Sequence, residues 1–312
     1  MKYVFLGSPP FAVPILAHLF DSPYRPTLVV TPPARRRGRG RRDATSPVAE
    51  LAEEVGVPVL QPETVRDPKV LERLAAEEAD VFLVASYGEF LREEFLELPR
   101  EACLNVHPSL LPRWRGATPV QAAILAGDAE TGTTIQRVVL ELDAGDVLVQ
   151  KRVPMLPGES AGELAGRLAS LSGEAAVEAL ARIDRNEAVY TPQDPERVTT
   201  CRKLTKEHGH LDWRRSAAEL ERHVLAMNPW PVAHTALPDH THLGVWRAAQ
   251  APLFDDAVPG EPGTVLAAKN RLLVRAGEGA LELLEVQAAG KRAMSAGDFL
   301  RGARLAVGDR LL

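Results

Sequence analysis

Residues 102–117 have the sequence Ala102-Cys103-Leu104-Asn105-Val106-His107-Pro108-Ser109-Leu110-Leu111-Pro112-Arg113-Trp114-Arg115-Gly116-Ala117. The apolar start of this segment predicts a short buried strand, and the strand should end near His107. Asn105 and His107 are two positions apart, so both side chains point to the same face of the strand. The apolar Cys103 shares that face but lies deeper along the strand, and we expect it only to pack.

An amide and an imidazole at the end of such a strand can serve as a catalytic pair. In open α/β sheets, ligands bind at the carboxyl ends of the strands. Hydrogen-bond donors at that edge can stabilise a carbonyl oxygen that becomes an oxyanion. Taken alone, however, the pair is better explained as an asparagine that caps a turn and a histidine that is bonded to the backbone.

The chain before and after this segment alternates between predicted strands and helices. Strands are predicted at 3–6, 28–31, 57–60 and 79–85, and helices at 11–19, 46–54, 68–77 and 119–126. This alternation predicts an α/β fold with a doubly wound, mostly parallel sheet and helices on both faces. The turn after the first strand lacks G-x-G-x-x-G spacing, so no dinucleotide is expected.

A hairpin-like unit and a long helix are predicted next. Strands at 133–139 and 147–153 flank the turn Leu142-Asp143-Ala144-Gly145-Asp146, which presents a carboxylate. Asp143 alone is most simply a turn-forming residue. The helix at 160–181 has an apolar stripe and should close the first domain.

The length of 312 residues suits two domains. We assign 1–188 to the first domain and 189–205, with Pro192 and Pro195, to a linker. Residues 206–312 form the second domain. Its helix at 216–227 and short strands at 233–237, 241–248, 263–267, 272–276 and 280–287 predict a small antiparallel β-barrel.

Composition limits the possible functions. The chain is 45% hydrophobic and 25% charged, and its net charge of −5 argues against coating nucleic acid along its length. Two distant cysteines without metal-ligand spacing fit a reducing, cytoplasmic compartment, and no apolar run approaches the ~20 residues of a membrane span. His234, His240 and His242 lack acidic or cysteine partners at motif spacing, so we interpret them as ordinary hairpin residues rather than metal ligands.

The segment at 32–42 is strongly basic and is called the basic segment below. It contains two glycines and six arginines, Arg35, Arg36, Arg37, Arg39, Arg41 and Arg42. Such a run cannot pack into a core and predicts a solvated cationic loop. Two interpretations stay open: a surface segment without a partner, or a site for nucleic acid or another polyphosphate, which arginine forks bind well.

The residues quoted above resemble a known family. Asn105–Ala117 is similar to the N-[IV]-H-[GP]-S-L-L-P-[RK]-[WY]-R-G-A signature of folate-dependent formyltransferases, and nearly the whole chain resembles the methionyl-tRNA formyltransferases. Leu142–Asp146 resembles their L-D-T-G-D segment, and Ser86-Tyr87-Gly88 resembles their A-Y-G segment. Residues 228–231 and 287–294 resemble segments of their C-terminal domain. Glu141 is a departure, because the family usually has glycine there.

The resemblance implies an activity. A formyl group would pass from 10-formyltetrahydrofolate, without a metal, to the α-amine of methionyl-initiator-tRNA for the initiation of translation. The C-terminal domain would be an OB-like barrel that contacts tRNA, and a cytoplasmic monomer is expected.

The resemblance also implies three groups of site residues. The catalytic residues would be Asn105, His107 and Asp143. The folate-binding residues would be Ser86, Tyr87, Gly88, Ser109, Leu110, Leu111 and Pro112. The tRNA-binding residues would be Arg35, Arg36, Arg37, Arg39, Arg41, Arg42, Lys203, Lys206, Lys291 and Arg292.

Three alternatives compete with this assignment. Glycinamide ribonucleotide formyltransferases resemble only the first domain. Sugar-nucleotide formyltransferases do not need the arginine segment. A non-catalytic RNA-binding protein of the same fold would not need Asn105, His107 and Asp143.

Overall fold

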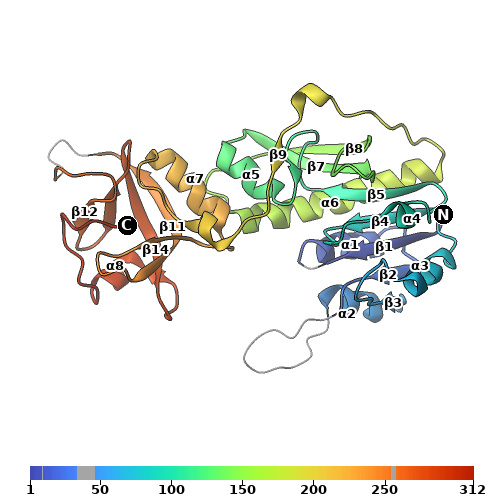
Figure 1. Ribbon diagram of the computed structural model, residues 1–312, viewed down its shortest axis with the longest axis horizontal. Helices are drawn as coiled ribbons and strands as arrows, with labels where there is room; N and C mark the ends of the chain where they lie inside the picture. The colour runs from blue at the N-terminus through green and yellow to red at the C-terminus, as the bar shows by residue number, and fades with distance from the viewer. Residues whose placement is uncertain (9, 34–45, 254–257) are drawn as a thin grey trace. The chain divides into compact units, whose positions relative to one another are not determined.

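The computed structural model describes residues 1–8, 10–33, 46–253 and 258–312, which form two compact units (Figure 1). The N-terminal unit comprises Met1–Pro119, Glu130–Pro154 and Ala165–Cys201. The C-terminal unit comprises Val120–Ala129, Met155–Leu164 and Arg202–Leu312. Each unit has a sheet of its own.

The elements up to the end of the long helix are β1 (Tyr3–Gly7), α1 (Ala12–Phe20), β2 (Leu28–Val30), α2 (Pro47–Glu54), β3 (Val59–Leu60), α3 (Pro68–Ala75), β4 (Val81–Ala85), α4 (Glu93–Leu96), β5 (Ala102–His107), β6 (Arg115–Gly116), α5 (Pro119–Ala126), β7 (Glu130–Arg137), β8 (Val147–Pro154) and α6 (Ala161–Asp184). The later elements are η1 (Pro195–Arg197), β9 (Thr200–Cys201), η2 (Lys206–Gly209), α7 (Ala217–Met227), β10 (Ala233–Ala236), β11 (His242–Ala251), β12 (Val265–Ala268), β13 (Leu272–Arg275), β14 (Ala280–Ala288), β15 (Met294–Ser295) and α8 (Ala296–Leu300).

The sheet of the N-terminal unit has seven strands in the order β3-β2-β1-β4-β5-β7-β8. The first five are parallel to one another, whereas β7 runs antiparallel to both β5 and β8. The predicted doubly wound, mostly parallel sheet is therefore confirmed. A second, two-stranded sheet pairs β6 with β9, so residues predicted as linker form part of this unit.

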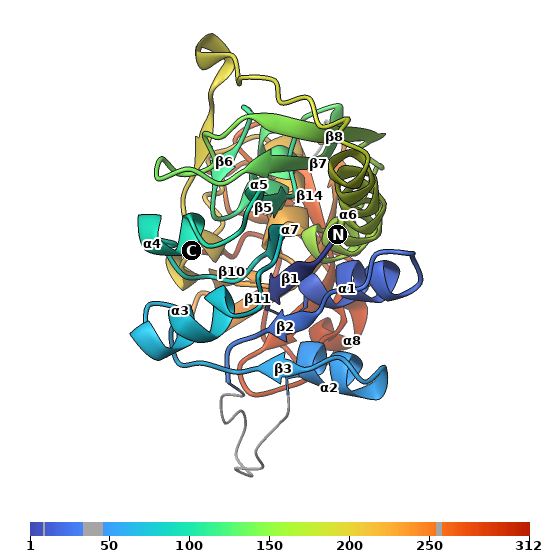
Figure 2. The same ribbon diagram turned by 90° about the vertical axis from the view of Figure 1, so that its right-hand side faces the viewer.

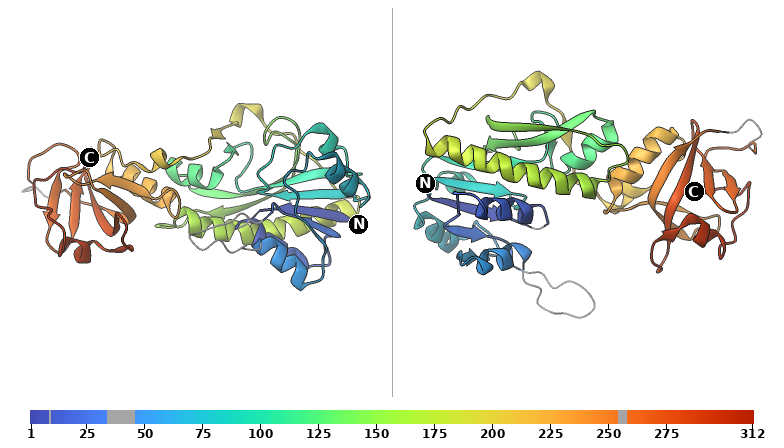
Figure 3. Two further views of the ribbon diagram at one scale, coloured as in Figure 1. Left: turned by 60° about the horizontal axis from the view of Figure 1, so that its bottom comes forward. Right: turned by 180° about the vertical axis from the view of Figure 1, so that it is seen from behind.

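Apolar side chains fill both faces of the large sheet. Helices α1, α2 and α6 cover one face, and α3 and α4 cover the other (Figure 2). Figure 3 shows the long α6 in yellow-green beside the strands that it covers. Within β5, Leu104 and Val106 belong to the first core and Cys103 to the second, so the strand alternates as its sequence predicts.

The sheet of the C-terminal unit is antiparallel, with the order β10-β11-β14-β13-β12 and with β15 paired to β14. It agrees with the predicted barrel-like domain. Helix α7 packs against β11 and β14 and begins at a capping box, in which Ser216 and Glu219 each accept the other's backbone N–H. The ring of His234 stacks on that of His242, with centroids 4.8 Å apart.

The part of the chain that the structure describes has neither a metal-binding cluster nor a membrane-spanning helix. No group of three or more histidine, cysteine, aspartate or glutamate side chains there could hold a metal ion. None of the helices there combines the length and the apolarity that crossing a bilayer requires.

One buried histidine links pH to the stability of the C-terminal unit. His223 on α7 is only 8% exposed. Burial, together with the positive charge of Arg215, lowers the pKa of His223 to about 4, below its ordinary value of 6.5. As pH falls from 6.5 towards 4, the unfolded chain therefore takes up a proton that the folded unit excludes.

We predict that the free energy of unfolding of the C-terminal unit falls by about 3 kcal/mol between pH 7 and pH 4 through His223. Urea unfolding, followed over this pH range, measures the effect. His223→Leu should flatten the pH dependence, whereas His240→Asn, at an exposed turn position with φ +65°, should leave it intact. An unchanged slope in His223→Leu would contradict the assignment.

Candidate active site

The site lies at the carboxyl end of β5. Asn105 and His107 come from the last three residues of this strand. Asn105 lies opposite Val84 of the parallel β4 and opposite Gln136 of the antiparallel β7. Sheet pairing on both sides therefore fixes the strand that presents the two predicted catalytic side chains.

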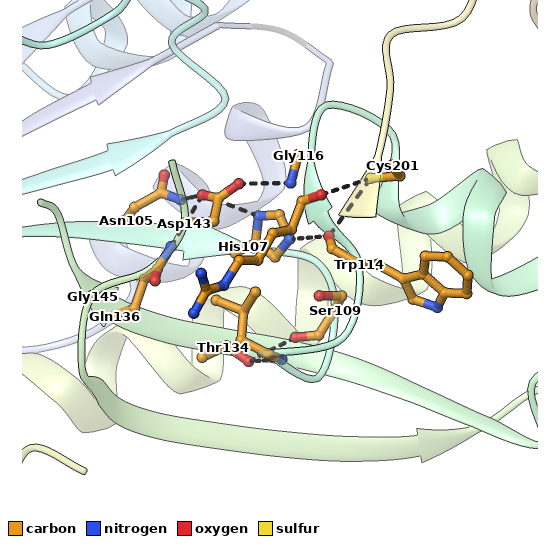
Figure 4. A network of polar contacts seen from close by, with 12 residues as sticks. Asn105, His107, Ser109, Trp114, Gly116, Thr134, Gln136, Asp143, Gly145 and Cys201 are labelled. Carbon is orange, nitrogen blue, oxygen red and sulfur yellow. Dashed lines mark hydrogen bonds and ion pairs between the residues drawn. The ribbon is translucent and has the colours of Figure 1, made fainter. Parts of the chain in front are cut away.

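The carboxylate of Asp143 is the common acceptor of the site (Figure 4). Its Oδ2 accepts the backbone N–H of Gly116 at 2.9 Å. Its Oδ1 accepts from the amides of Gln136 at 3.1 Å and Asn105 at 3.4 Å. Asp143 has a left-handed φ of +52°, a conformation in which Asp and Asn are enriched among non-glycine residues.

The imidazole of His107 is held at both nitrogens. Nε2 lies 2.9 Å from the carbonyl oxygen of Trp114, which can only accept, so Nε2 carries a hydrogen. Nδ1 lies 3.6 Å from Asp143 Oδ1. Because the side chains of His107 and Asp143 are only 5% and 10% exposed, their interaction is largely shielded from water.

The three predicted catalytic residues thus come together. Nδ1 is the nitrogen of His107 that faces the carboxylate, and it can accept a proton or, once protonated, donate one. The second N–H of the Asn105 amide remains a donor beyond the one directed at Asp143. The arrangement supplies a hydrogen-bond donor for a developing oxyanion and a carboxylate–imidazole pair that can move a proton.

The segment after β5 is held by its own polar groups. The Ser109 hydroxyl donates to the carbonyl of Arg113 at 2.6 Å, and the Thr134 hydroxyl donates to the carbonyl of Ser109 at 2.6 Å. Ser109 is fully buried, so its hydroxyl organises the loop. Of the other residues predicted here to bind folate, Leu111 is buried, and Leu110 and Pro112 are partly exposed.

The remaining predicted folate residues, Ser86, Tyr87 and Gly88, directly follow β4. Since β4 and β5 are parallel neighbours, this loop leaves the sheet at the edge that carries His107. Ser86 and Gly88 are exposed, whereas Tyr87 is buried. Within the described part of the chain the Tyr87 hydroxyl finds no hydrogen-bond partner, and burial, with the nearby charge of Glu89, raises its pKa.

The predicted tRNA-binding residues fall into two groups. Lys203, Lys206, Lys291 and Arg292 are all exposed on the C-terminal unit. The arginines of the basic segment lie outside the described residues. These are Arg35, Arg36, Arg37, Arg39, Arg41 and Arg42.

Sequence reasoning missed three groups that complete the site. They are the amide of Gln136, the carbonyl of Trp114 and the side chain of Gln193. Of these three, only Gln136 could have been predicted from the sequence, because it belongs to a predicted strand beside the turn that carries Asp143. A backbone carbonyl has no sequence signature, and Gln193 lies in a segment with linker composition.

Two family models match the chain. The model described as "Formyl transferase" covers residues 1–180, and "Formyl transferase, C-terminal domain" covers residues 203–304. Curated relatives match over the full length. The methionyl-tRNA formyltransferase of Methylococcus capsulatus is 45% identical over 100% of this chain and 99% of its own. That of Roseiflexus is 42% identical over 100% and 95%.

The chain belongs to the methionyl-tRNA formyltransferase family.

Solved structures share the fold of this member of the methionyl-tRNA formyltransferase family. HypX from Aquifex aeolicus, in complex with tetrahydrofolic acid, is 18% identical, with a TM-score of 0.63 over 98% of this chain and 50% of that one. An N-formyltransferase from Helicobacter canadensis, in complex with folinic acid and dTDP-3-aminofucose, is 15% identical, with a TM-score of 0.66 over 92% and 99%.

The turn that carries Asp143 leaves no room for a side chain at Gly145. A Cβ atom there would lie 1.8 Å from the carbonyl oxygen of Arg137. We predict that Gly145→Ala displaces the carboxylate and lowers kcat by about 10-fold or more, because small misplacements of catalytic groups are costly. Steady-state formylation kinetics measure this loss.

Gly166→Ala on α6 is the matched control, since a Cβ at that position meets nothing within 4 Å. It should keep wild-type turnover and raise the free energy of unfolding by roughly 0.5–1 kcal/mol. Wild-type kcat in Gly145→Ala would refute the steric argument.

Proposed function

We propose that this chain transfers the formyl group of 10-formyltetrahydrofolate to the α-amine of methionyl-tRNA through Asn105, His107 and Asp143, and so serves the initiation of translation. The activity follows from family membership. The observation that supports these residue roles is the convergence of the Asn105 amide and the His107 Nδ1 on one carboxylate oxygen.

Formyl transfer places negative charge on the formyl oxygen when the amine attacks the formyl carbon. Asn105 stabilises that charge through its amide, because one N–H is directed at Asp143 and the other can meet the oxygen. The strand pairing on both sides of Asn105 holds this donor before the substrate binds. A donor fixed in this way costs little reorganisation during the reaction.

The attacking amine must lose a proton, and the departing N10 of the folate must gain one. His107 and Asp143 take up and return this proton. The Trp114 carbonyl keeps the hydrogen of Nε2 engaged, so Nδ1 is the nitrogen that exchanges a proton beside Asp143 Oδ1. Once protonated, Nδ1 holds this proton beside Asp143 Oδ1 until it passes to N10.

The binding assignments are part of the proposal. Ser86–Gly88 and residues 109–112 border the folate, and the unpaired Tyr87 hydroxyl supports a ligand or water in this region. The initiator tRNA is contacted by the basic segment and by Lys203, Lys206, Lys291 and Arg292. A monomeric state and a cytoplasmic location complete the proposal.

We predict that Asn105→Ala and His107→Ala each lower kcat by about 10²-fold or more, through the loss of an oxyanion donor and of a proton-transfer group respectively. The fold should survive, since neither side chain belongs to an apolar core cluster. Transfer of a labelled formyl group, measured beside thermal unfolding, tests both expectations.

Asn270→Ala and His18→Ala are matched controls, because both residues are exposed. They should retain wild-type kcat. Near wild-type turnover in Asn105→Ala or His107→Ala would remove that residue from the mechanism.

A further prediction concerns the basic segment. Replacing Arg39, Arg41 and Arg42 by alanine should weaken tRNA binding and reduce the slope of log affinity against log salt by roughly 0.7–0.9 for each phosphate contact that is lost. Titration of labelled tRNA at several salt concentrations measures the slope. Folate binding should not change.

The matched control for this triple variant removes the same charge elsewhere on the N-terminal unit. Arg66, Arg100 and Arg185 all have exposed side chains. Their triple alanine variant should keep the wild-type salt slope. If both triple variants reduce the salt slope of tRNA binding alike, the change in net charge explains the effect, and the basic segment does not contact the phosphates.

A further inference from the structure

The side chain of Gln193 reaches the turn that presents Asp143. Its Nε2 lies 2.8 Å from the backbone carbonyl oxygen of Asp143, 2.7 Å from that of Gly145 and 3.1 Å from Oε1 of Gln136. Three acceptors therefore surround one NH₂ group. Gln193 lies in the segment predicted as a linker, eight residues before Cys201.

The orientation of the Gln193 amide is determined by Arg115. Nε of Arg115 donates to Oε1 of Gln193 at 3.0 Å. A guanidinium can only donate, so the oxygen of the amide must face Arg115 and the nitrogen must face the three acceptors. The same guanidinium donates from Nη1 to Glu141 at 3.0 Å, so Arg115 contacts both Gln193 and the residue two before Asp143.

Gln193 thereby also determines the orientation of Gln136. This second amide is 1% exposed and directs its Oε1 at Gln193. Its Nε2 is then left to donate to Asp143 Oδ1, at 3.1 Å. If Gln136 were inverted, its oxygen would face the carboxylate and repel it, so the donor pattern at Asp143 depends on the amide behind it.

Gln193 acts on the backbone of the turn as well. Asp143 has a left-handed φ of +52°, which is a sparsely populated conformation for a residue with a side chain. The bonds from one amide to the carbonyls of Asp143 and Gly145 bridge this turn. The carboxylate is therefore held by contacts both to its oxygens and to its own backbone.

We propose that Gln193 is a positioning residue for formyl transfer, which holds the Asp143 carboxylate against His107 and Asn105 by fixing the turn and the Gln136 amide. The inference rests on the proposed function, since it presumes that Asp143 is catalytic. Gln193 contacts Asp143 and Gln136 but neither Asn105 nor His107 in the bonds described above, so its effect on the reaction passes through Asp143.

The test compares the full-length wild-type chain with Gln193→Met and Gln193→Ala. Methionine keeps nearly the length of glutamine and removes its donors and its carbonyl acceptor. Both variants should lose about 10-fold or more in kcat, because misplaced catalytic groups are costly. The KM values for 10-formyltetrahydrofolate and methionyl-tRNA should stay within about 3-fold of wild type, since no binding contact is removed.

A second measurement separates positioning from general stability. In an Asp143→Ala background, followed by single-turnover formylation with enzyme in excess, Gln193→Met should cause little further loss. Glu196→Gln is the matched control, since it is an exposed residue of the same segment. It should leave kcat, KM and the melting temperature unchanged.

The outcomes distinguish this inference from the proposed function. If Asp143→Ala keeps wild-type turnover, the proposed function itself fails. If Asp143→Ala is impaired but Gln193→Met is not, only the positioning role fails. A full Gln193→Met effect in the Asp143→Ala background, or loss of the folded state in both Gln193 variants, would also overturn the inference.

Discussion

A nearly buried carboxylate is the constraint around which the site is built. The side chain of Asp143 is 10% exposed, and an ionised carboxylate in such a place is costly unless hydrogen-bond donors replace water. Gly116 supplies a backbone N–H to one oxygen, and Gln136 and Asn105 supply amides to the other. The proposed proton chemistry of His107 is possible only because these donors keep the carboxylate in place.

These donors come from segments that are far apart in the chain, so the fold has to assemble them. Gln136 and Asn105 face each other across the β5–β7 pairing. Gly116 of β6 donates its N–H to Asp143, and β6 pairs with β9. The two strands lie so close that a Cβ on Gly116 would be 2.1 Å from the carbonyl oxygen of Cys201. The segment around Cys201, near the end of the N-terminal unit, therefore supports the loop around Trp114. These two residues are in contact although they are 87 positions apart in the chain.

Sequence reasoning predicted what depends on local periodicity and missed what depends on distant contacts. The two-residue spacing of Asn105 and His107 predicted their common face, and the β/α alternation predicted the sheet. Some predicted strand and helix ends were wrong: β7 spans Glu130–Arg137 rather than 133–139, and α6 continues to Asp184 rather than ending at 181. Gln193 could not be found, because proline and acidic neighbours give its segment the composition of a linker while its function comes from tertiary hydrogen bonds.

The buried Cys103 and the half-buried Cys201 have a chemical consequence for the site. Cys103 shares a strand face with Asn105 and His107, yet it is 3% exposed, and burial raises its pKa. Cys201 contacts the carbonyl of Trp114, and burial raises its pKa too. Both therefore remain uncharged thiols near neutral pH, poor targets for peroxide or alkylating electrophiles. The proposed catalytic centre is therefore bordered by two thiols of low reactivity.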